Sequence, residues 1–466
     1  MEYQDIYFLS SHEAQKVANA QNRSSDKLKL QVCYYHGDRI ETDLLNLVHL
    51  PIENLVDGLA VSNYRLPTIL NTDGMNLSDD VYANILSQFQ SSVEYAGVLR
   101  RELNKHYFDL LQNSKLDFNE PLRFWLSGHS QTDVHQHVTR SIANTLENLG
   151  YEVLYSFLHG CEADVDLKEL VSFNPHVYIN INFMQNFLSP EVINFVWIQD
   201  TFAFDEINFN KIRTDKDHFF TLISSFDTIL EKKNINFQRQ SFCVNNDAYK
   251  LDNTILREKK IVFIGSSYFE LIEDTDDKLD NIIEFLVKNF IEGVTFTDIY
   301  LNKISADFSI DIEYIKEILL PYIIRDYSIL ELVTLDTDFK IEIYGKGWDK
   351  YKSLEPFYKG FLTYGDDIAN VYRSATYALC PHTLYVLQQR VLESSACGAI
   401  PVVYDCKHTT GDEPYNEGIC YYKSKKDLEN ILVKSPNNKD LSRIVYENSY
   451  ENLANKILKI IDINNG

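Results

Sequence analysis

Short apolar runs alternate with helix-forming segments through two long stretches of the chain, and this rhythm limits the fold more than any other feature. The first series of runs lies at 123–127, 152–157, 176–183, 194–199 and 227–230, and the second at 261–265, 340–344, 375–380, 399–404 and 419–422. Strands separated by helices are typical of βαβ units with a parallel sheet. Each series therefore predicts one Rossmann-like domain of an α/β protein.

The remaining segments set the expected domain boundaries. A polar stretch at 245–259 reads as a linker between the two series, and the tail at 443–461 is amphipathic. Residues 1–120 show strand-like runs without a clear βα rhythm, apart from a helix expected at 78–113. Two domains joined by a linker leave a cleft, and open α/β sheets bind ligands at the carboxyl ends of their strands.

Charge and composition exclude several classes of protein. Of 466 residues, 44 are Lys or Arg and 68 are Asp or Glu, giving a net charge of −24. This balance argues against general binding to nucleic acid or to anionic lipid. No apolar run is long enough to span a bilayer, the acidic N-terminus does not resemble a signal peptide, and the seven cysteines are scattered. We therefore expect a globular cytoplasmic protein with free thiols.

One short segment carries the strongest chemical signal. Residues 388–396 predict a short helix that ends at Gly398, where a left-handed turn leads into the next strand. Arg390 and Glu393 lie three residues apart and so share one helix face. A carboxylate there can accept hydrogen bonds from a ribose diol, and a guanidinium suits phosphate. The alternative is that Arg390 and Glu393 form a solvated ion pair with each other.

This segment resembles the nucleotide-sugar signature of GT-B glycosyltransferases, especially the bacterial, CgeB-like spore-maturation branch of the family-4-like enzymes. The residues that match the signature are Arg390, Glu393, Ala396, Cys397 and Gly398. Further matches occur in the family's order along the second series: Phe263–Gly265, Arg325 opening a helix, the turn Tyr344–Trp348, Gly360–Tyr364 and Tyr372. In the first series, Trp197–Asp200 resembles the end of a family strand. The resemblance spans about 123–460 and leaves residues 1–120 without a counterpart.

The resemblance implies a fold and an activity. It implies two Rossmann-like domains facing across a cleft, with an acceptor domain at 121–250, a nucleotide-sugar domain at 257–442 and a C-terminal helix at 443–466 that braces the first domain. Residues 1–120 would form an accessory domain that could contact a partner protein or another subunit. By family analogy, the implied reaction transfers a hexose from a UDP- or GDP-type donor to a protein or surface-glycan acceptor. It would proceed with retention and without a metal or other cofactor.

The resemblance also assigns roles to residues of the donor site. Glu393 would hold the ribose hydroxyls, and Gly345 and Gly347 would let the donor approach the backbone. Arg325 and Lys346, with Arg390, would neutralise the leaving diphosphate. The chain departs from the pattern in two places. Tyr385 stands where family-4 enzymes often have a first glutamate, and Ser266 and Ser267 follow Gly265 where Arg and Lys are usual.

Candidate catalytic residues follow strand ends of the first series. His129 or Asp133 could contact the acceptor or the donor sugar, and Asp200 could bind a sugar hydroxyl. A solvated or loop-capping role is an equal alternative for His129 and the preferred one for His135 and His137, which point to different helix faces. No metal site is expected, because the Asp-x-Asp motifs at 164–166, 274–276 and 336–338 are explained by solvated acidic loops.

Other functions stay open from sequence alone. The departures at Tyr385 and after Gly265 allow a non-catalytic GT-B partner subunit of an active transferase. A sugar epimerase or a phosphorylase of the same fold would also bind a sugar nucleotide or phosphate. Motifs typical of kinases, dehydrogenases, zinc proteases and serine hydrolases are absent from the sequence.

Overall fold

The computed structural model describes residues 5–23, 32–41, 47–62, 66–129, 133–158, 166–272, 277–407, 418–434 and 440–465. The chain divides into two compact units, one of Met1–Phe219 with Ile461–Gly466 and one of Phe220–Ile460. In the part of the chain that is described, no helix is both long and apolar enough to cross a bilayer.

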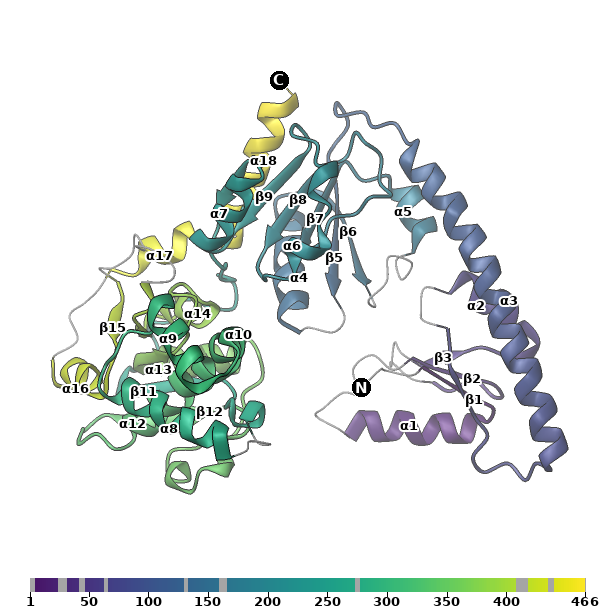
Figure 1. Ribbon diagram of the computed structural model, residues 1–466. Helices are drawn as coiled ribbons and strands as arrows, with labels where there is room; N and C mark the ends of the chain where they lie inside the picture. The colour runs from purple at the N-terminus through teal and green to yellow at the C-terminus, as the bar shows by residue number, and fades with distance from the viewer. Residues whose placement is uncertain are drawn as a thin grey trace. The chain divides into compact units, whose positions relative to one another are not determined.

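Three separate sheets form the framework of the protein (Figure 1). Their strand orders are β3-β2-β1-β4, β10-β9-β8-β7-β5-β6 and β12-β11-β13-β14-β15. The predicted α/β class is confirmed, with Rossmann-like parallel sheets in both of the expected regions. The predicted cleft between the two regions and the predicted domain boundaries stay predictions.

The first sheet lies in the region that was expected to be accessory. Its strands are β1 (Ile6–Phe8), β2 (Cys33–Tyr35), β3 (Leu47–His49) and β4 (Ile69–Asn71), and all of their pairings are parallel. Buried Tyr7, Tyr34 and Leu59 pack between this sheet and the helices that cover it. Strands of three residues are too short to give a periodic signal, so the sequence did not reveal this parallel sheet.

Three helices accompany the first sheet: α1 (Ser11–Arg23), α2 (Leu55–Val61) and α3 (Asp79–Gln112). The helix predicted at 78–113 is therefore confirmed. With 34 residues, α3 is about 50 Å long. It packs against α2 and buries Phe89 and Ala96 on the face toward the first sheet, while Leu111 near its C-terminal end joins the core of the second.

The second sheet contains β5 (Arg123–His129), β6 (Glu152–Leu158), β7 (Val177–Ile181), β8 (Ile193–Ile198), β9 (Asp217–Thr221) and β10 (Phe237–Arg239). Its helices are α4 (Asp133–Asn148), α5 (Leu167–Phe173), α6 (Ala203–Glu206) and α7 (Ser224–Lys232). The strand expected at 227–230 is wrong, since these residues lie in α7. Phe226 and Leu230 are buried one helical turn apart, and helical spacing explains the apolar run.

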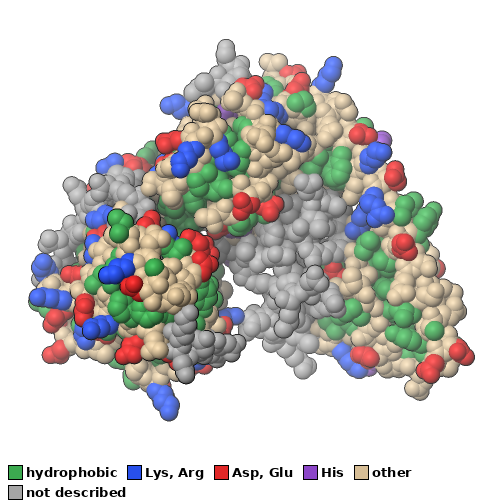
Figure 2. All heavy atoms as spheres, in the orientation of Figure 1, with side chains coloured by type: hydrophobic (Ala, Val, Ile, Leu, Met, Phe, Trp, Pro, Cys, Tyr) green, Lys and Arg blue, Asp and Glu red, His purple; other side chains and the backbone are tan. Residues whose placement is uncertain are grey.

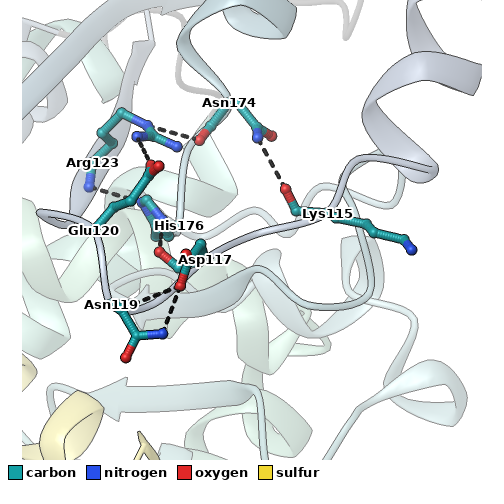
Figure 3. Close-up of polar contacts among 7 residues, drawn as sticks. All are labelled: Lys115, Asp117, Asn119, Glu120, Arg123, Asn174 and His176. Carbon is teal, nitrogen blue, oxygen red and sulfur yellow. Dashed lines mark hydrogen bonds and ion pairs between the residues drawn. The ribbon is translucent and has the colours of Figure 1, made fainter.

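A hydrogen-bonded junction fastens the segment between α3 and β5 to the second sheet (Figure 3). His176 Nδ1 accepts from the Arg123 backbone N–H at 3.1 Å, so Nε2 carries the hydrogen and donates to the Asp117 carbonyl at 3.1 Å. The Arg123 side chain donates to the Asn174 carbonyl and to Glu120. Burial, followed by the charge of Arg123, lowers the pKa of His176, which is therefore a neutral structural histidine.

The third sheet is formed by β11 (Glu258–Ile264), β12 (Lys340–Tyr344), β13 (Ala375–Cys380), β14 (Ile400–Tyr404) and β15 (Cys420–Tyr422), all parallel. Helices α8 (Asp277–Ile291), α9 (Asp298–Phe308), α13 (Asp366–Ser374), α14 (Gln389–Ala396) and α16 (Lys425–Val433) accompany it. After β11 the chain adds β12 on one side and β13 on the other. The gap between the carboxyl ends of β11 and β13 is thus a topological switch point.

A continuous helical segment leads into β12. It runs through α10 (Ile312–Tyr314), η5 (Ile315–Leu319), α11 (Leu320–Tyr322), η6 (Ile323–Tyr327) and α12 (Ser328–Leu332), and both η5 and η6 are π-helical turns. Pro321 lacks an N–H and crowds the carbonyl one turn earlier, which accounts for the widening at η5. Arg325 lies inside η6, so the expectation that it opens a helix is wrong.

The tail forms α17 (Ser442–Glu447) and α18 (Tyr450–Asn465). Lys456 donates to the Gln240 side chain at 2.7 Å, and Ser449 forms a β-bridge with Val244. The tail is therefore joined to the segment that follows β10. Its role as a brace for the first Rossmann-like domain stays a prediction.

Candidate functional site

Gly265 after β11 and Gly345 after β12 let the backbones of these two strand ends approach closely. A Cβ on Gly345 would lie 2.2 Å from the Gly265 carbonyl oxygen, and Trp348 Nε1 donates to that same oxygen at 2.7 Å. Gly345 and Gly347 both have positive φ, 130° and 80°. These glycines are therefore required by backbone packing and turn geometry. Their predicted contact with a donor stays a prediction.

Glu393 is a buried carboxyl at the heart of α14. Its side chain is 3% exposed, and Oε1 accepts hydrogen bonds from the Tyr364 hydroxyl at 2.8 Å and from Gln389 Nε2 at 3.2 Å. Burial raises the pKa of Glu393 to about 7, against the lowering effect of Tyr364 and Gln389. A half-ionised buried carboxyl costs free energy unless a ligand uses it, which marks Glu393 as a functional candidate.

Arg390 does not form the ion pair that the sequence left open as an alternative. Its guanidinium donates to Gln388 Oε1 at 3.0 Å and lies 5.8 Å from the centre of the Phe263 ring. Among the described residues, no carboxylate lies within ion-pair distance of Arg390. The guanidinium also reaches the end of β11, where a Cβ on Gly265 would lie 2.7 Å from Nη2.

Arg325 brings a second guanidinium to the same place from the π-helical turn η6. It is 5% exposed, donates to the Ser266 carbonyl at 3.3 Å and stacks 3.7 Å from the centre of the Tyr268 ring. Its Nε is buried and has no hydrogen-bond partner in the described part of the chain. Burial, followed by the nearby charge of Arg390, lowers the pKa of Arg325 to about 10.

Asp326 follows Arg325 in sequence but is directed elsewhere. Its carboxyl accepts from Ser267 Oγ at 2.5 Å, from the Tyr268 backbone N–H at 3.1 Å and from the Tyr351 hydroxyl at 2.8 Å. Burial raises the pKa of Asp326. Asp326 thus fixes the loop after β11 and forms no direct ion pair with Arg325 within the described structure.

Two further residues lie in the loop between β13 and α14. Tyr385, at the position of the missing glutamate, packs against His382 with ring centres 4.7 Å apart and the ring planes tilted by 38°. His382 was not singled out from the sequence, where its place between a strand and the motif helix is its only signal. Burial, followed by the charges of Arg325 and Arg390, lowers the pKa of His382 to about 3.

The predicted phosphate ligands therefore separate into two groups. Arg325 and Arg390 converge at the β11–β13 switch point, whereas Lys346 is exposed and contributes its carbonyl to Ser267 N–H. On the face shown in Figure 2, the described Lys and Arg side chains are interspersed with Asp and Glu. The buried Arg325 and the half-buried Arg390 form a local concentration of positive charge.

The candidate residues of the first Rossmann-like sheet form a hydrogen-bonded cluster of their own. Asp200 Oδ2 accepts from Asn182 Nδ2 at 2.7 Å and lies 3.4 Å from His135 Nε2. Burial alone would raise the pKa of Asp200, but His135 and Asn182 hold it below its ordinary value. His135, for which a solvated role was preferred, is thus a partner of Asp200. The side chains of His129 and Asp133 lie outside the described residues.

The described residues contain no group of three or more His, Cys, Asp or Glu side chains placed to hold a metal. The expectation of a metal-independent site stays a prediction. Asp166 of the first Asp-x-Asp motif caps α5, and Asp338 of the third pairs with Lys259. The second motif lies outside the described residues.

A cavity of about 440 Å³ lies in the same compact unit as the arginine pair. Its lining includes Ile324, which precedes Arg325 in sequence, and Thr383, which follows His382, but not the two arginines themselves. Ile299, Lys316 and Tyr404 also line it. The cavity is mainly apolar, with hydroxyl groups and one cation at its wall.

Comparison with protein families agrees with this location of the site. Residues 325–457 match a family described as glycosyl transferase-like. The match begins at Arg325 and includes β12, β13, α14 and the Arg390–Glu393 motif. It covers less than a third of the chain and leaves the first two sheets unmatched. Comparison with curated proteins gives no match.

Solved structures with some similarity include several sugar-transferring enzymes. A sucrose-phosphate synthase from Thermosynechococcus elongatus has a TM-score of 0.45 and 9% identity over 73% of this chain and 98% of its own. WaaG, a glycosyltransferase involved in lipopolysaccharide biosynthesis, gives 0.37 and 12% over 72% and 95%. HepE from Anabaena, in complex with UDP and glucose, gives 0.37 and 9% over 74% and 97%. Such low scores carry no argument about activity.

Proposed function

We propose that the protein is a GT-B-type glycosyltransferase that uses a nucleotide-diphosphate sugar. The observation that carries the proposal is the pair Arg325 and Arg390 at the β11–β13 switch point, without carboxylate ion pairs in the described structure and beside the buried Glu393. Two adjacent guanidiniums repel each other, and an anion that binds between them relieves this repulsion. The family match over the same residues supports the choice of donor.

The three side chains divide the work of donor binding and departure. Ionised Glu393 would accept hydrogen bonds from the ribose hydroxyls, with Tyr364 and Gln389 holding its orientation. Arg325 and Arg390 would bind the diphosphate. As the bond from the anomeric carbon to the diphosphate oxygen breaks, negative charge grows on the leaving group, and fixed cations lower the barrier. Neither step requires a metal, and we propose a metal-independent, retaining hexosyl transfer.

For the acceptor, we propose only its class and the region of the protein that would bind it. The mainly apolar cavity lined by Thr383 and Ile324 offers room for a sugar or an acceptor group. We propose a protein or surface-glycan acceptor, with Asp200, His129 or Asp133 contacting sugar hydroxyls. The first sheet and α3 form a further folded region that could dock such an acceptor, a partner protein or another subunit.

The proposal is tested by nucleotide binding followed by donor turnover. Thermal shift of the full chain with UDP, GDP, ADP, CMP and dTDP should give stabilisation by one diphosphate, about 2.7 kcal/mol at a hundredfold excess over the dissociation constant. Glu393→Ala should abolish the shift, and Glu429→Ala, at an exposed position of α16, should retain it.

Turnover separates the remaining functions. Slow release of UDP from UDP-glucose, or of GDP from GDP-mannose, supports a transferase, whereas interconversion without nucleoside diphosphate release indicates an epimerase. Binding without turnover, even in the presence of acceptor extracts, favours the non-catalytic partner subunit. No stabilisation by any of the five nucleotides at millimolar concentration would overturn the proposal.

A further inference from the structure

His382 has a hydrogen-bonding pattern that fixes which ring nitrogen carries a hydrogen. Its Nδ1 accepts from the backbone N–H of Leu384 at 3.0 Å and of Tyr385 at 3.2 Å. A nitrogen that accepts two hydrogen bonds cannot carry a hydrogen, so in the neutral ring Nε2 must be the donor. No residue in the described structure accepts a hydrogen bond from Nε2.

The surroundings of His382 keep the ring neutral. Arg325 on η6 and Arg390 on α14 are close enough for their charges to oppose protonation of the imidazole, and burial adds to the effect. The phenol ring of Tyr385, from the same loop, packs against the imidazole at a tilt. These neighbours therefore present His382 as a neutral N–H donor at neutral pH, in a place where a cation would be repelled and an anion attracted.

We infer that His382 is a third ligand of the anion that binds Arg325 and Arg390, donating Nε2–H to a phosphate oxygen. The inference rests on the proposed function for the identity of that anion as the diphosphate of a nucleotide sugar. It adds a residue outside the sequence motif. It also gives a binding role to the loop between β13 and α14, which contains Tyr385 at the position of the missing glutamate.

The neutral ring offers an advantage over a third cation. A buried lysine or arginine at this position would add a like charge to two existing ones, and its desolvation would cost several kcal/mol in the ligand-free protein. A neutral N–H still donates a strong, directional hydrogen bond to an anionic oxygen, and it avoids the desolvation and repulsion of a third charge.

The hydrogen bonds to Nδ1 hold the loop, so an alanine variant would lose loop stability as well as the Nε2–H donor. The test therefore uses a matched pair of variants. In His382→Asn, the amide oxygen can accept from the same loop N–H groups, as in an Asx-turn, while the Nε2–H is removed. In His382→Ala, both the loop contacts and the donor are lost. Equal melting temperatures for wild type and His382→Asn without ligand would show that the loop is intact.

The probe is inorganic pyrophosphate, which reports the anion site without requiring the correct base or sugar, followed by UDP and GDP. We expect His382→Asn to weaken pyrophosphate binding about tenfold by isothermal titration calorimetry, the effect of one hydrogen bond to a charged group. In ¹H–¹⁵N spectra of the wild-type imidazole, Nε2–H should persist from pH 5 to 8 and its proton signal should shift when pyrophosphate is added.

The possible outcomes separate this inference from the proposed function. Wild-type affinity in His382→Asn, or an imidazole that titrates near pH 6.5, would overturn the role of His382 while leaving nucleotide binding untouched. Pyrophosphate binding that depends on His382, without binding of any nucleoside diphosphate, would support the anion site and overturn the nucleotide-sugar function. Loss of wild-type binding to every probe would overturn both.

Discussion

The charged side chains at the carboxyl ends of the strands are arranged differently in the two Rossmann-like sheets. In the second sheet, Asp200 after β8 is held by Asn182 and His135. In the third sheet, Arg325 and Arg390 approach each other without carboxylate ion pairs in the described structure. The first cluster is complete without a ligand, whereas the second places like charges together in a buried setting.

This difference indicates which edge has to be completed by a ligand. A satisfied hydrogen-bond cluster can orient a substrate hydroxyl at little cost to the fold, since its own groups are already paired. Adjacent buried cations reduce stability until an anion arrives, and part of the binding free energy is that relief. We therefore expect substitutions at the two edges to have opposite effects on stability and on nucleotide affinity.

The largest effect should come from Arg390→Met. Removal of a guanidinium that lacks an ion pair should leave the melting temperature of the ligand-free protein unchanged or raise it. Nucleoside diphosphate affinity should fall about a hundredfold, because two charge-assisted hydrogen bonds are lost. Calorimetric titration with the nucleotide selected by thermal shift, together with denaturant unfolding, measures both quantities.

Arg213→Met in the second sheet supplies the contrast. Arg213 pairs at 2.5 Å with Asp217, whose side chain is fully buried. Its loss should reduce stability by about 2–3 kcal/mol, discounted because Arg213 is partly exposed, and leave nucleotide affinity unchanged in the folded protein. Arg213→Met breaks an ion pair with a buried carboxylate at the amino end of β9. If Arg390→Met destabilises the ligand-free chain as much as Arg213→Met does, the description of Arg390 as a cation without an ion pair is wrong.

A pH-dependent effect should follow from Glu393→Gln. The carboxyl has a pKa of about 7 in the folded protein, above its unfolded value near 4.3. The folded state therefore binds more protons between these values, and the ionised side chain lowers stability increasingly as pH rises through that window. Glu393→Gln should be more stable than wild type at pH 8, by at most on the order of 3 kcal/mol, and similar at pH 4.

Thermal unfolding of the two proteins from pH 4 to pH 8 measures this dependence. Nucleotide affinity of Glu393→Gln should fall despite the gain in stability, since an amide cannot accept both ribose hydroxyls. A stability difference that is constant across the pH range would show that Glu393 does not titrate there. Glu429→Gln, on the exposed face of α16, is the matched control.

The smallest expected effect on nucleotide binding is that of Asp200→Asn. The variant keeps a side chain of the same shape, so the Asn182 and His135 contacts are weakened rather than removed. Nucleoside diphosphate affinity should stay within about twofold of wild type, whereas sugar transfer or donor hydrolysis should fall about tenfold if Asp200 binds a sugar hydroxyl. Equal turnover in both proteins would remove Asp200 from the reaction.

The sequence predicted what depends on local pattern. The apolar runs gave nine of the strands of the two Rossmann-like sheets within a few residues, and the 390–398 motif placed Glu393 on α14 as the structure has it. Helical spacing was misread at 227–230, because four apolar-rich residues fit either periodicity. In the first sheet, three-residue strands left no period to read.

Properties that arise from distant contacts could not be read in this way. The collision that a side chain at Gly345 would have with Gly265 joins residues eighty positions apart. The pairing of Asp200 with His135, and the convergence of Arg325 and His382, likewise depend on how separate loops meet at a strand edge. Identity of a residue was visible in the sequence, but its electrostatic environment was not.

The π-helical turn that carries Arg325 has a consequence for how this site can change over evolutionary time. Such a turn contains one residue more than an α-helical turn, and removal of that residue restores a regular helix. The part of the helix on one side of the deletion would then be rotated by about 100° about the helix axis relative to the part on the other side. Deletion of a single codon in this helical segment, at a position other than Arg325, could therefore turn Arg325 away from the anion site while every residue of the site is kept.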